Sequence, residues 1–318
     1  MGLHKQRKLK ASKMKNRIIQ VVVLFIGVFA FAQQDPHYTQ YMYNMSVMNP
    51  AYAGSKENLS MGILYRKQWV DIEDAPTTGT FFGHSPVGKN LGLGLSVIKD
   101  KIGPVEENNV YADISYTLNL GGEHKLAFGI KTGLTLHKVG LFDEVYPTLP
   151  DANDPAFSEN TNNSYFNIGS GFFYYTNKYY LGLSVPNLMK SKHLDFNGRE
   201  YGSEVSHYFL TGGYVFDINE NVKFKPFFMM KSAFGAPTSL DLSTNFLFNQ
   251  KFEIGATYRL EDSFGAMVNY AITPNLKLGY AYDHIVSDLK VTTPSSHEII
   301  LLFDLNFPKK VSSSPRFF

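Results

Sequence analysis

The stretch VYADISYTLNL, residues 110–120, decides the fold class. Its even-numbered residues are all apolar, and most of the residues between them are polar. Alternation with a period of two is typical of a β-strand that has one apolar face and one polar face. The next run, from Leu126 to Leu134, repeats the alternation and places Phe128 and Ile130 on the face opposite Lys131.

About fourteen such runs follow one another beyond residue 58, and turn signals separate them. They lie near 59–69, 77–84, 91–98, 109–120, 124–136, 164–175, 178–185, 207–216, 222–231, 239–248, 252–260, 263–272, 275–283 and 297–306. The outward apolar face of these runs includes Leu93, Leu95, Leu126, Phe128, Ile130, Leu276 and Leu278. We therefore predict an all-β, antiparallel fold.

Composition excludes several other classes of protein. The 318 residues have a mean hydropathy of −0.17, which excludes a bundle of membrane-spanning helices. The absence of Cys removes thiolate metal sites, disulfides and thiol nucleophiles. With 26 Phe and 20 Tyr but only 18% charged residues, the chain is also unlike a soluble α/β enzyme.

Residues 1–32 are typical of a signal peptide. Seven Lys and Arg precede an uncharged apolar stretch, Ile18–Phe31, and Ala30-Phe31-Ala32 has the small-x-small form of a cleavage site. The alternative, a membrane anchor, requires about 20 apolar residues, which this stretch does not provide. Removing seven basic and no acidic residues changes the formal net charge from +2 to −5. The mature chain has no basic patch with interleaved aromatics, so we expect no nucleic-acid partner.

Connection lengths distinguish two architectures for so many strands, a soluble sandwich or propeller and a transmembrane β-barrel. Every second connection is tight, and the three longest, 137–163, 186–206 and 284–296, all belong to the other set. An outer-membrane barrel has short periplasmic turns and longer outer loops, whereas a sandwich has no reason to sort its loops. We predict a barrel over 59–307 that contacts outer-membrane lipid, with both termini and the C-terminal tail 308–318 in the periplasm.

The inward face of this barrel carries charges of both signs and many glycines. The predicted charged residues are Arg66, Lys131, Lys225, Lys231, Arg259 and Lys277 with Asp113, Asp241, Glu253, Asp283, Glu298 and Asp304. A mixed-sign wall suits salt-bridged packing better than an ion-selective pore. The glycines are Gly92, Gly94, Gly129, Gly133, Gly169, Gly171, Gly182, Gly255 and Gly279. They either mark the close approach of another chain segment or only permit the barrel to coil.

The segment 33–58 fits no strand. Residues 34–55 read QDPHYTQYMYNMSVMNPAYAGS, rich in Tyr, Met and Asn, with a turn signal at Asn49-Pro50. So many aromatics require burial. A plug inside the barrel provides that burial, and so does docking on a periplasmic partner.

Several motifs now resemble one protein family. The N-terminal motifs are Gln34-Asp35-Pro36, Gln40-Tyr41-Met42 and Asn49-Pro50-Ala51-Tyr52-Ala53-Gly54. Further along the chain lie Arg66-Lys67-Gln68-Trp69, Ala75-Pro76-Thr77-Thr78, Asp100-Lys101-Ile102-Gly103-Pro104, Gly182-Leu183-Ser184-Val185-Pro186-Asn187, Lys225-Pro226-Phe227-Phe228 and Ser296-His297-Glu298-Ile299. In this order they strongly resemble the PorP/SprF family, outer-membrane proteins of the Bacteroidetes type IX secretion system. The resemblance covers essentially the whole mature chain.

The resemblance implies a non-enzymatic component of a protein-export and gliding apparatus. Members are associated with large adhesins that carry a C-terminal targeting domain and with periplasmic parts of the secretion motor. The N-terminal signature is carried over as a candidate plug or partner surface. Its residues here are Asp35, Pro36, Gln40, Tyr41, Met42, Asn49, Pro50, Ala51, Tyr52 and Gly54.

Other functions have weaker support in the sequence. Gly83-His84-Ser85-Pro86-Val87 imitates a nucleophile elbow but has Val87 where that motif needs Gly. Asp151, Asn153 and Asp154 match a Ca²⁺ site less well than a solvated loop. We therefore expect that the protein is not an enzyme and binds no metal or cofactor. The runner-up is a passive porin or lipophile channel, which would have an open lumen with a one-sign constriction or a continuous apolar path.

Overall fold

The computed structural model describes residues 37–140, 160–189, 192–196, 199–203, 206–233, 237–287 and 295–305. The predicted signal peptide 1–32, the tail 308–318 and the loop residues Asp151, Asn153 and Asp154 lie outside this part of the chain.

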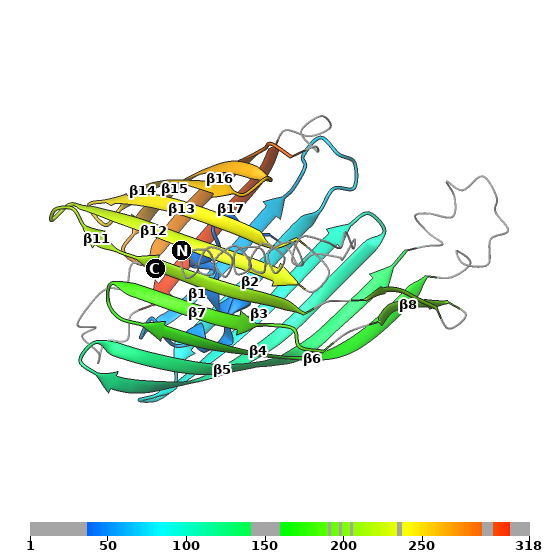
Figure 1. The fold of residues 1–318 in the computed structure, drawn as a ribbon, viewed down its shortest axis with the longest axis horizontal. Coiled ribbons are helices and arrows are strands. Elements are labelled where there is room, and N and C mark those ends of the chain that lie inside the picture. Colours follow the sequence, from blue (N-terminus) through cyan, green and yellow to red (C-terminus); the bar gives the residue numbers. More distant parts are fainter. Residues whose placement is uncertain are drawn as a thin grey trace, which may run out of the picture.

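Fourteen antiparallel strands form one closed barrel (Figure 1). They are β1 (Leu59–Lys67), β2 (Thr77–Pro86), β3 (Leu91–Ile102), β4 (Val105–Gly121), β5 (His124–Val139), β6 (Thr161–Tyr175), β7 (Tyr179–Val185), β10 (His207–Tyr214), β12 (Val222–Ala233), β13 (Ser239–Phe248), β14 (Phe252–Arg259), β15 (Ser263–Thr273), β16 (Leu276–Ile285) and β17 (Ser295–Leu305). The barrel closes where β1 pairs with β17 along its whole length. The predicted fold class and strand number are confirmed.

Three further strands are short, and only one of them pairs with the barrel. β11 (Phe216–Asp217) extends the edge of β12, and β8 (Lys192–Phe196) pairs only with β9 (Arg199–Ser203) as a separate hairpin between β7 and β10. Because the strands alternate in direction, β1, β5, β7 and β16 all end at the same end of the barrel, and the four links that follow them, 68–76, 140–160, 186–206 and 286–294, are the longest. We call this the long-loop end and the opposite end the short-turn end.

The two faces of the wall follow the predicted register. On β5, Ile130 is 57% exposed and the next residue, Lys131, is fully buried. Of the twelve charged residues predicted to face inward, ten are buried, and Lys277 and Asp304 are half-buried near the short-turn end. Of the seven residues predicted to face lipid, Leu126 and Leu276 are half-buried and the other five are exposed.

Four neighbouring strands reach further than their apolar pattern predicts. β3, β4, β5 and β6 extend three or four residues beyond the predicted runs, all at the long-loop end. The added residues, such as Glu106, Glu107, Asn162 and Asn163, are polar on both faces, so alternation disappears while backbone pairing continues. Hydrophobic periodicity reports burial on one face and is silent where both faces are polar.

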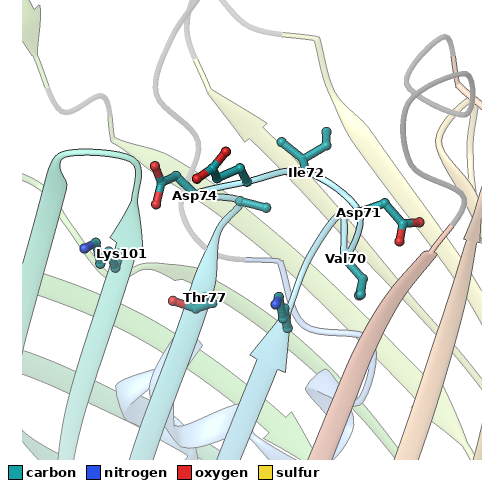
Figure 2. Close-up of a pocket in the computed structure, with 9 residues that line it drawn as sticks. Val70, Asp71, Ile72, Asp74, Thr77 and Lys101 are labelled. Atoms are coloured by element: carbon teal, nitrogen blue, oxygen red, sulfur yellow. The ribbon is translucent and has the colours of Figure 1, made fainter. Parts of the chain in front are cut away.

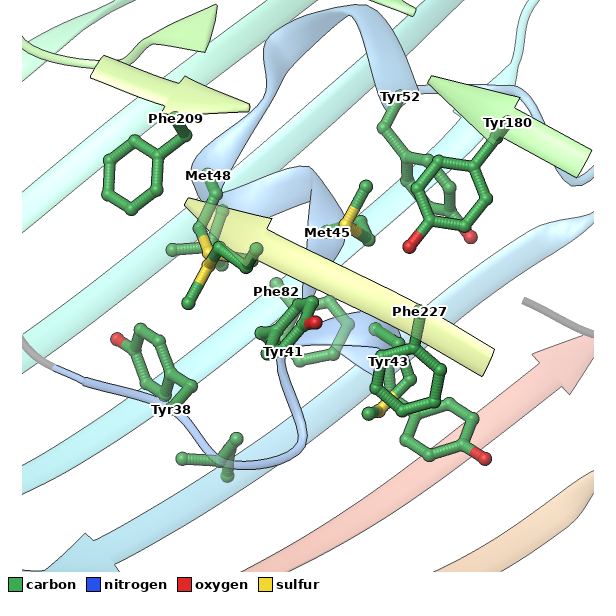
Figure 3. Packing of buried hydrophobic residues seen from close by; sticks show 14 of the residues in the cluster. Tyr38, Tyr41, Tyr43, Met45, Met48, Tyr52, Phe82, Tyr180, Phe209 and Phe227 are labelled. Atoms are coloured by element: carbon green, nitrogen blue, oxygen red, sulfur yellow. The ribbon is translucent and has the colours of Figure 1, made fainter. Parts of the chain in front are cut away.

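The buried apolar cluster lies inside the barrel, between its wall and the chain that precedes β1. This chain forms three single-turn helices, η1 (Tyr41–Tyr43), α2 (Met45–Met48) and η2 (Pro50–Tyr52). Figure 3 shows its Tyr and Met side chains packed among Phe82, Tyr180, Phe209 and Phe227 of the wall. Within the described residues, the helices are all too short to cross a membrane.

Candidate functional site: the N-terminal segment in the lumen

Residues 37–55, here called the N-terminal segment, run through the lumen from the long-loop end to the short-turn end. Thr39 contacts Arg66, one residue before β1 ends at the long-loop end. Ala53 contacts Gly92, close to the tight β2–β3 turn, and β1 begins at Leu59 beside it. All sixteen residues from Tyr38 to Ala53 are buried. Burial on this scale means that the segment fills the space between the strands it contacts.

Charged side chains hold the segment to three neighbouring strands at the closing seam. The backbone N–H groups of Thr39 and Gln40 donate to the two carboxylate oxygens of Glu298 on β17, at 2.9 and 2.8 Å. The Thr39 hydroxyl donates to Asp283 on β16 at 2.5 Å and accepts from Arg66 on β1 at 2.8 Å. Arg66 also pairs with Asp283 at 2.7 Å and Glu298 at 3.2 Å. The segment thus completes a buried network whose charges come from β1, β16 and β17.

A second charged network surrounds Tyr43 near the short-turn end. Its hydroxyl donates to Glu253 at 2.5 Å, and Glu253 also accepts from Lys225 at 3.0 Å. The ammonium groups of Lys225 and Lys277 lie 5.3 and 5.0 Å from the centre of the Tyr43 ring, in cation–π geometry. Burial and the neighbouring Glu253 raise the pKa of Tyr43, which belongs to no membrane-spanning strand, well above its ordinary value. The phenol therefore stays protonated and donates.

Glycines of the wall receive the segment on β3, β5, β6 and β7. A Cβ at Gly129 would lie 2.2 Å from the backbone nitrogen of Ala51, and one at Gly92 would lie 2.2 Å from the carbonyl oxygen of Ala53. At Gly171 it would lie 2.2 Å from the Asn49 side chain. The backbone of the segment therefore lies where only glycine leaves room.

The nine inward glycines were predicted either to mark the close approach of another chain segment or only to permit the barrel to coil, and they divide between these two explanations. The N-terminal segment contacts six of them, Gly92, Gly94, Gly129, Gly171, Gly182 and Gly279. The other three, Gly133, Gly169 and Gly255, instead face neighbouring strands or the residues that follow β7. Close approach of another segment thus accounts for most of the glycines but not for all.

The Asn49-Pro50 turn anchors the segment to the wall. The Asn49 side chain caps η2 by accepting from the Ala51 N–H at 3.0 Å, and Pro50 occupies the first helical position. The same side chain donates to the carbonyl oxygen of Phe172 at 3.0 Å. Ala51 is fully buried above Gly129.

The remaining signature residues pack against side chains of the wall. Tyr52 makes edge contacts with His84 and Phe173, and Tyr41 makes one with Phe227. Gly54 has a φ of +72° and its N–H donates to His84 at 3.2 Å. Met42 is 2% exposed and lines a small cavity together with Tyr180 and Phe227.

The structure brings eight of the ten predicted site residues together in the lumen, and Asp35 and Pro36 lie outside the described residues. The prediction missed Thr39 and Tyr43, although their hydroxyl groups donate to the buried carboxylates of Asp283 and Glu253. Both residues lie just outside the quoted motifs, and no pattern in the sequence singles them out. Among the described residues, no three His, Cys, Asp or Glu side chains gather as metal ligands.

Two cavities open near the long-loop end. The larger, about 480 Å³, lies under the β1–β2 loop between Lys67, Asp71, Asp74 and Lys101 (Figure 2). A smaller one, about 50 Å³, lies between Val47 and Met48 of the N-terminal segment and the wall. Both are lined by charged or polar groups as well as apolar ones.

Two comparisons with known proteins found similar chains. A family model described as type IX secretion system membrane protein PorP/SprF matches residues 30–303. Among solved structures, the CymD monoaromatic hydrocarbon channel is similar at 11% identity and a TM-score of 0.50, covering 83% of this chain and 93% of that chain. The Acinetobacter baumannii outer membrane protein Omp33 is similar at 11% identity and a TM-score of 0.45, covering 79% and 100%. No curated protein matched the chain.

Proposed function

The chain belongs to the PorP/SprF family of type IX secretion system membrane proteins, and from this premise we propose that it supports the export or surface attachment of large adhesin-like cargo. In this proposal the protein is not an enzyme, and its N-terminal segment keeps the lumen closed to solutes. The coarser conclusion, an outer-membrane β-barrel of a secretion system, follows from the family and the closed sheet.

The burial of sixteen consecutive residues inside the barrel carries the proposal. A passive channel needs a continuous path, yet the N-terminal segment contacts the wall on both sides of the lumen, at Glu298 on β17 and at Gly129 on β5. Charged wall residues are also paired with one another, as in Lys131 with Asp113 at 2.8 Å. Such pairs favour packing around a fixed occupant over conduction.

A deletion of residues 35–54 that keeps the predicted signal peptide tests both halves of the proposal. We expect barrel assembly, read from heat-modifiable gel migration, to remain largely intact and adhesin display on the cell surface to be lost. We expect planar-bilayer conductance to rise because the lumen opens. Normal adhesin display would refute the role in export, and unchanged conductance would refute the plug.

The runner-up function is a passive porin or lipophile channel. The similarity to CymD supports it only at the level of the fold, since identity is 11%. A purified wild-type barrel that conducts ions or passes apolar solutes as well as the deletion variant does would favour this function over ours.

The orientation is part of the proposal: the short-turn end and both termini face the periplasm, where the secretion motor would dock. Because the chain has no Cys, single cysteines are clean probes. Asp71, exposed in the β1–β2 loop, and Asn219, exposed in the link between β11 and β12, mark the two ends. In intact cells we expect a membrane-impermeant maleimide to label Asp71→Cys and not Asn219→Cys; the reverse result would invert the orientation.

A further inference from the structure

The hydrogen-bonded wall is incomplete at the long-loop end of β6. β5 pairs with β6 along all of Thr161–Tyr175, whereas β7 pairs with it only from Ser170 onward. Residues 161–169 thus have a strand partner on one side only, within the described residues. The β8–β9 hairpin, which continues the chain beyond β7, pairs with itself and not with β6.

The irregular residues that follow β7 cover the lower part of this edge. Gly169 leaves room for the carbonyl of Pro186, whose oxygen would lie 2.2 Å from a Cβ there. The Leu188 N–H donates to the carbonyl of Ile168 at 2.8 Å, and the Met189 N–H donates to the Asn167 side chain at 3.3 Å. Before Asn167, no described residue after β7 makes a backbone hydrogen bond to this edge of β6.

Alternation of the backbone shows which groups stay open. In an antiparallel strand the N–H and C=O of one residue point to the same side, and successive residues point to opposite sides. Because the Ile168 carbonyl points away from β5, the N–H and C=O groups of Asn162, Ser164 and Phe166 do so too. No described residue pairs with these groups, and all three side chains are exposed.

This edge also lacks the features that usually protect one. Natural edge strands carry Lys, Pro or bulges that prevent pairing with another chain. The sequence from Thr161 to Asn167 is TNNSYFN, with no charge and no Pro, and its pairing with β5 has no bulge. Phe166 is its last outward apolar residue, and Asn162 and Ser164 lie beyond it toward water.

We propose that the β6 edge from Asn162 to Phe166 is a docking site that binds an extended segment of the exported cargo by β-strand addition. The cargo is taken from the proposed function, on which this inference therefore rests. Main-chain hydrogen bonds supply the affinity in strand addition, and side chains beside the added strand supply the selectivity. Here Phe166 favours a β-branched or aromatic residue opposite it.

A second copy of this chain is a poorer occupant. Two copies inserted the same way in one membrane present β6 in the same direction, so their edges meet only as parallel strands. Parallel pairing is the less stable arrangement, whereas a free segment can pair antiparallel. The cargo segment is thus favoured over a dimer.

Ser164→Pro removes one open-edge N–H without removing a hydrogen bond to β5. Pro is tolerated at sheet edges, and the preceding Asn163 is already extended, as a residue before Pro prefers. Ser164→Ala is the matched control because it keeps the N–H. In cells we expect Ser164→Pro to lower surface display of a tagged cargo about tenfold, with unchanged barrel level and heat-modifiable migration, and Ser164→Ala to behave as wild type.

A photo-cross-linking residue gives a second readout that does not depend on folding of the Pro variant. Placed at Ser164 it should form an adduct with the tagged cargo, whereas at Leu136, opposite Ser164 and paired on both sides, it should not. Normal display in Ser164→Pro, a cross-link to a second copy, or a cross-link within this chain would each overturn the docking site. Normal display in a strain lacking the whole protein would instead overturn the proposed function.

Discussion

The N-terminal segment meets two sides of the barrel through different physics. Toward β16, β17 and β1 it is held by charge-assisted hydrogen bonds, such as the Thr39 and Gln40 N–H groups on Glu298. Toward β3 and β5 it is held by shape, because the backbone of Ala51 and Ala53 lies against Gly129 and Gly92, and toward β6 the uncharged Asn49 side chain adds a hydrogen bond to the Phe172 carbonyl. The charged contacts with β16, β17 and β1 are strong only while every partner is present. The contacts with the glycines are close packing, which any side chain added at a glycine would disrupt.

The two sides therefore fail in different ways. Removing one member of a buried charged network leaves the others unpaired in a medium that solvates them poorly, which costs several kcal/mol. Adding a side chain to a glycine contact forces the segment to move, at the lower cost of overpacking. The comparison predicts a descending series of stability losses, measured as urea unfolding of the barrel in detergent and read from unheated gel migration.

Arg66→Ala is expected to have the largest effect. Asp283 and Glu298, 3% exposed or less in their side chains, would lose the cation that pairs with both. The expected loss is about 3–5 kcal/mol in the free energy of unfolding. Arg66→Lys should restore part of this loss because it keeps the charge but not the forked geometry. A loss of less than about 1 kcal/mol would show that water replaces the arginine and that the seam does not depend on the network.

Gly129→Val tests the other side of the comparison. Its side chain would occupy the position of the Ala51 backbone, so we expect a loss of about 1–3 kcal/mol and faster proteolysis of the N-terminal segment. Gly79→Val is the matched control, since a Cβ there meets nothing within 4 Å and β-branched residues suit strands. Equal losses in the two variants would mean that strand propensity, and not contact with the segment, decides the effect.

The same two sides show what the sequence alone could predict. Alternation fixes which face a side chain occupies, so the inward position of Arg66, Asp283 and Glu298 was predictable residue by residue. Their pairing was not, because 232 residues separate Arg66 from Glu298 and only closure of the sheet brings them together. The glycines remained ambiguous for a similar reason: a missing side chain does not say what fills the space.

Local signals also have limits inside the N-terminal segment. The Asn49-Pro50 turn was predictable because a side-chain cap and a fixed proline φ act within three residues. The single-turn helices η1 and α2 were not, since three or four residues are too few for helical periodicity. The contacts of Tyr43 depend on Lys225 and Glu253, each about two hundred residues away.

Tyr43→Phe tests a single hydroxyl group of the charged contacts and leaves the ion pair between Lys225 and Glu253 in place. It removes the hydrogen bond to Glu253 and a longer one that the Tyr43 hydroxyl accepts from Lys225 at 3.4 Å. Glu253 keeps Lys225 at 3.0 Å and also accepts from the Asn245 side chain at 2.5 Å. The aromatic ring remains in cation–π contact with Lys225 and Lys277. We expect a loss of about 1.5 kcal/mol, at the lower end of the range for a hydrogen bond to a charged group, because Glu253 keeps its other donors. A loss as large as that of Arg66→Ala would show that Tyr43 organises the whole network.

Lys99→Ala is expected to have the smallest effect and sets the baseline for the charged side. Lys99 on β3 pairs with Glu106 on β4 at 3.0 Å, but the two side chains are 61% and 33% exposed. Water and salt screen such a pair, and its loss should cost less than about 1 kcal/mol. The remaining effect should vanish in about 1 M salt, where the screening length falls to about 3 Å, whereas the loss in Arg66→Ala should persist because its network is buried. If both variants lost their effect in salt, the lumen would be open to ions, and the charged contacts of the N-terminal segment would be no stronger than those on the outer surface.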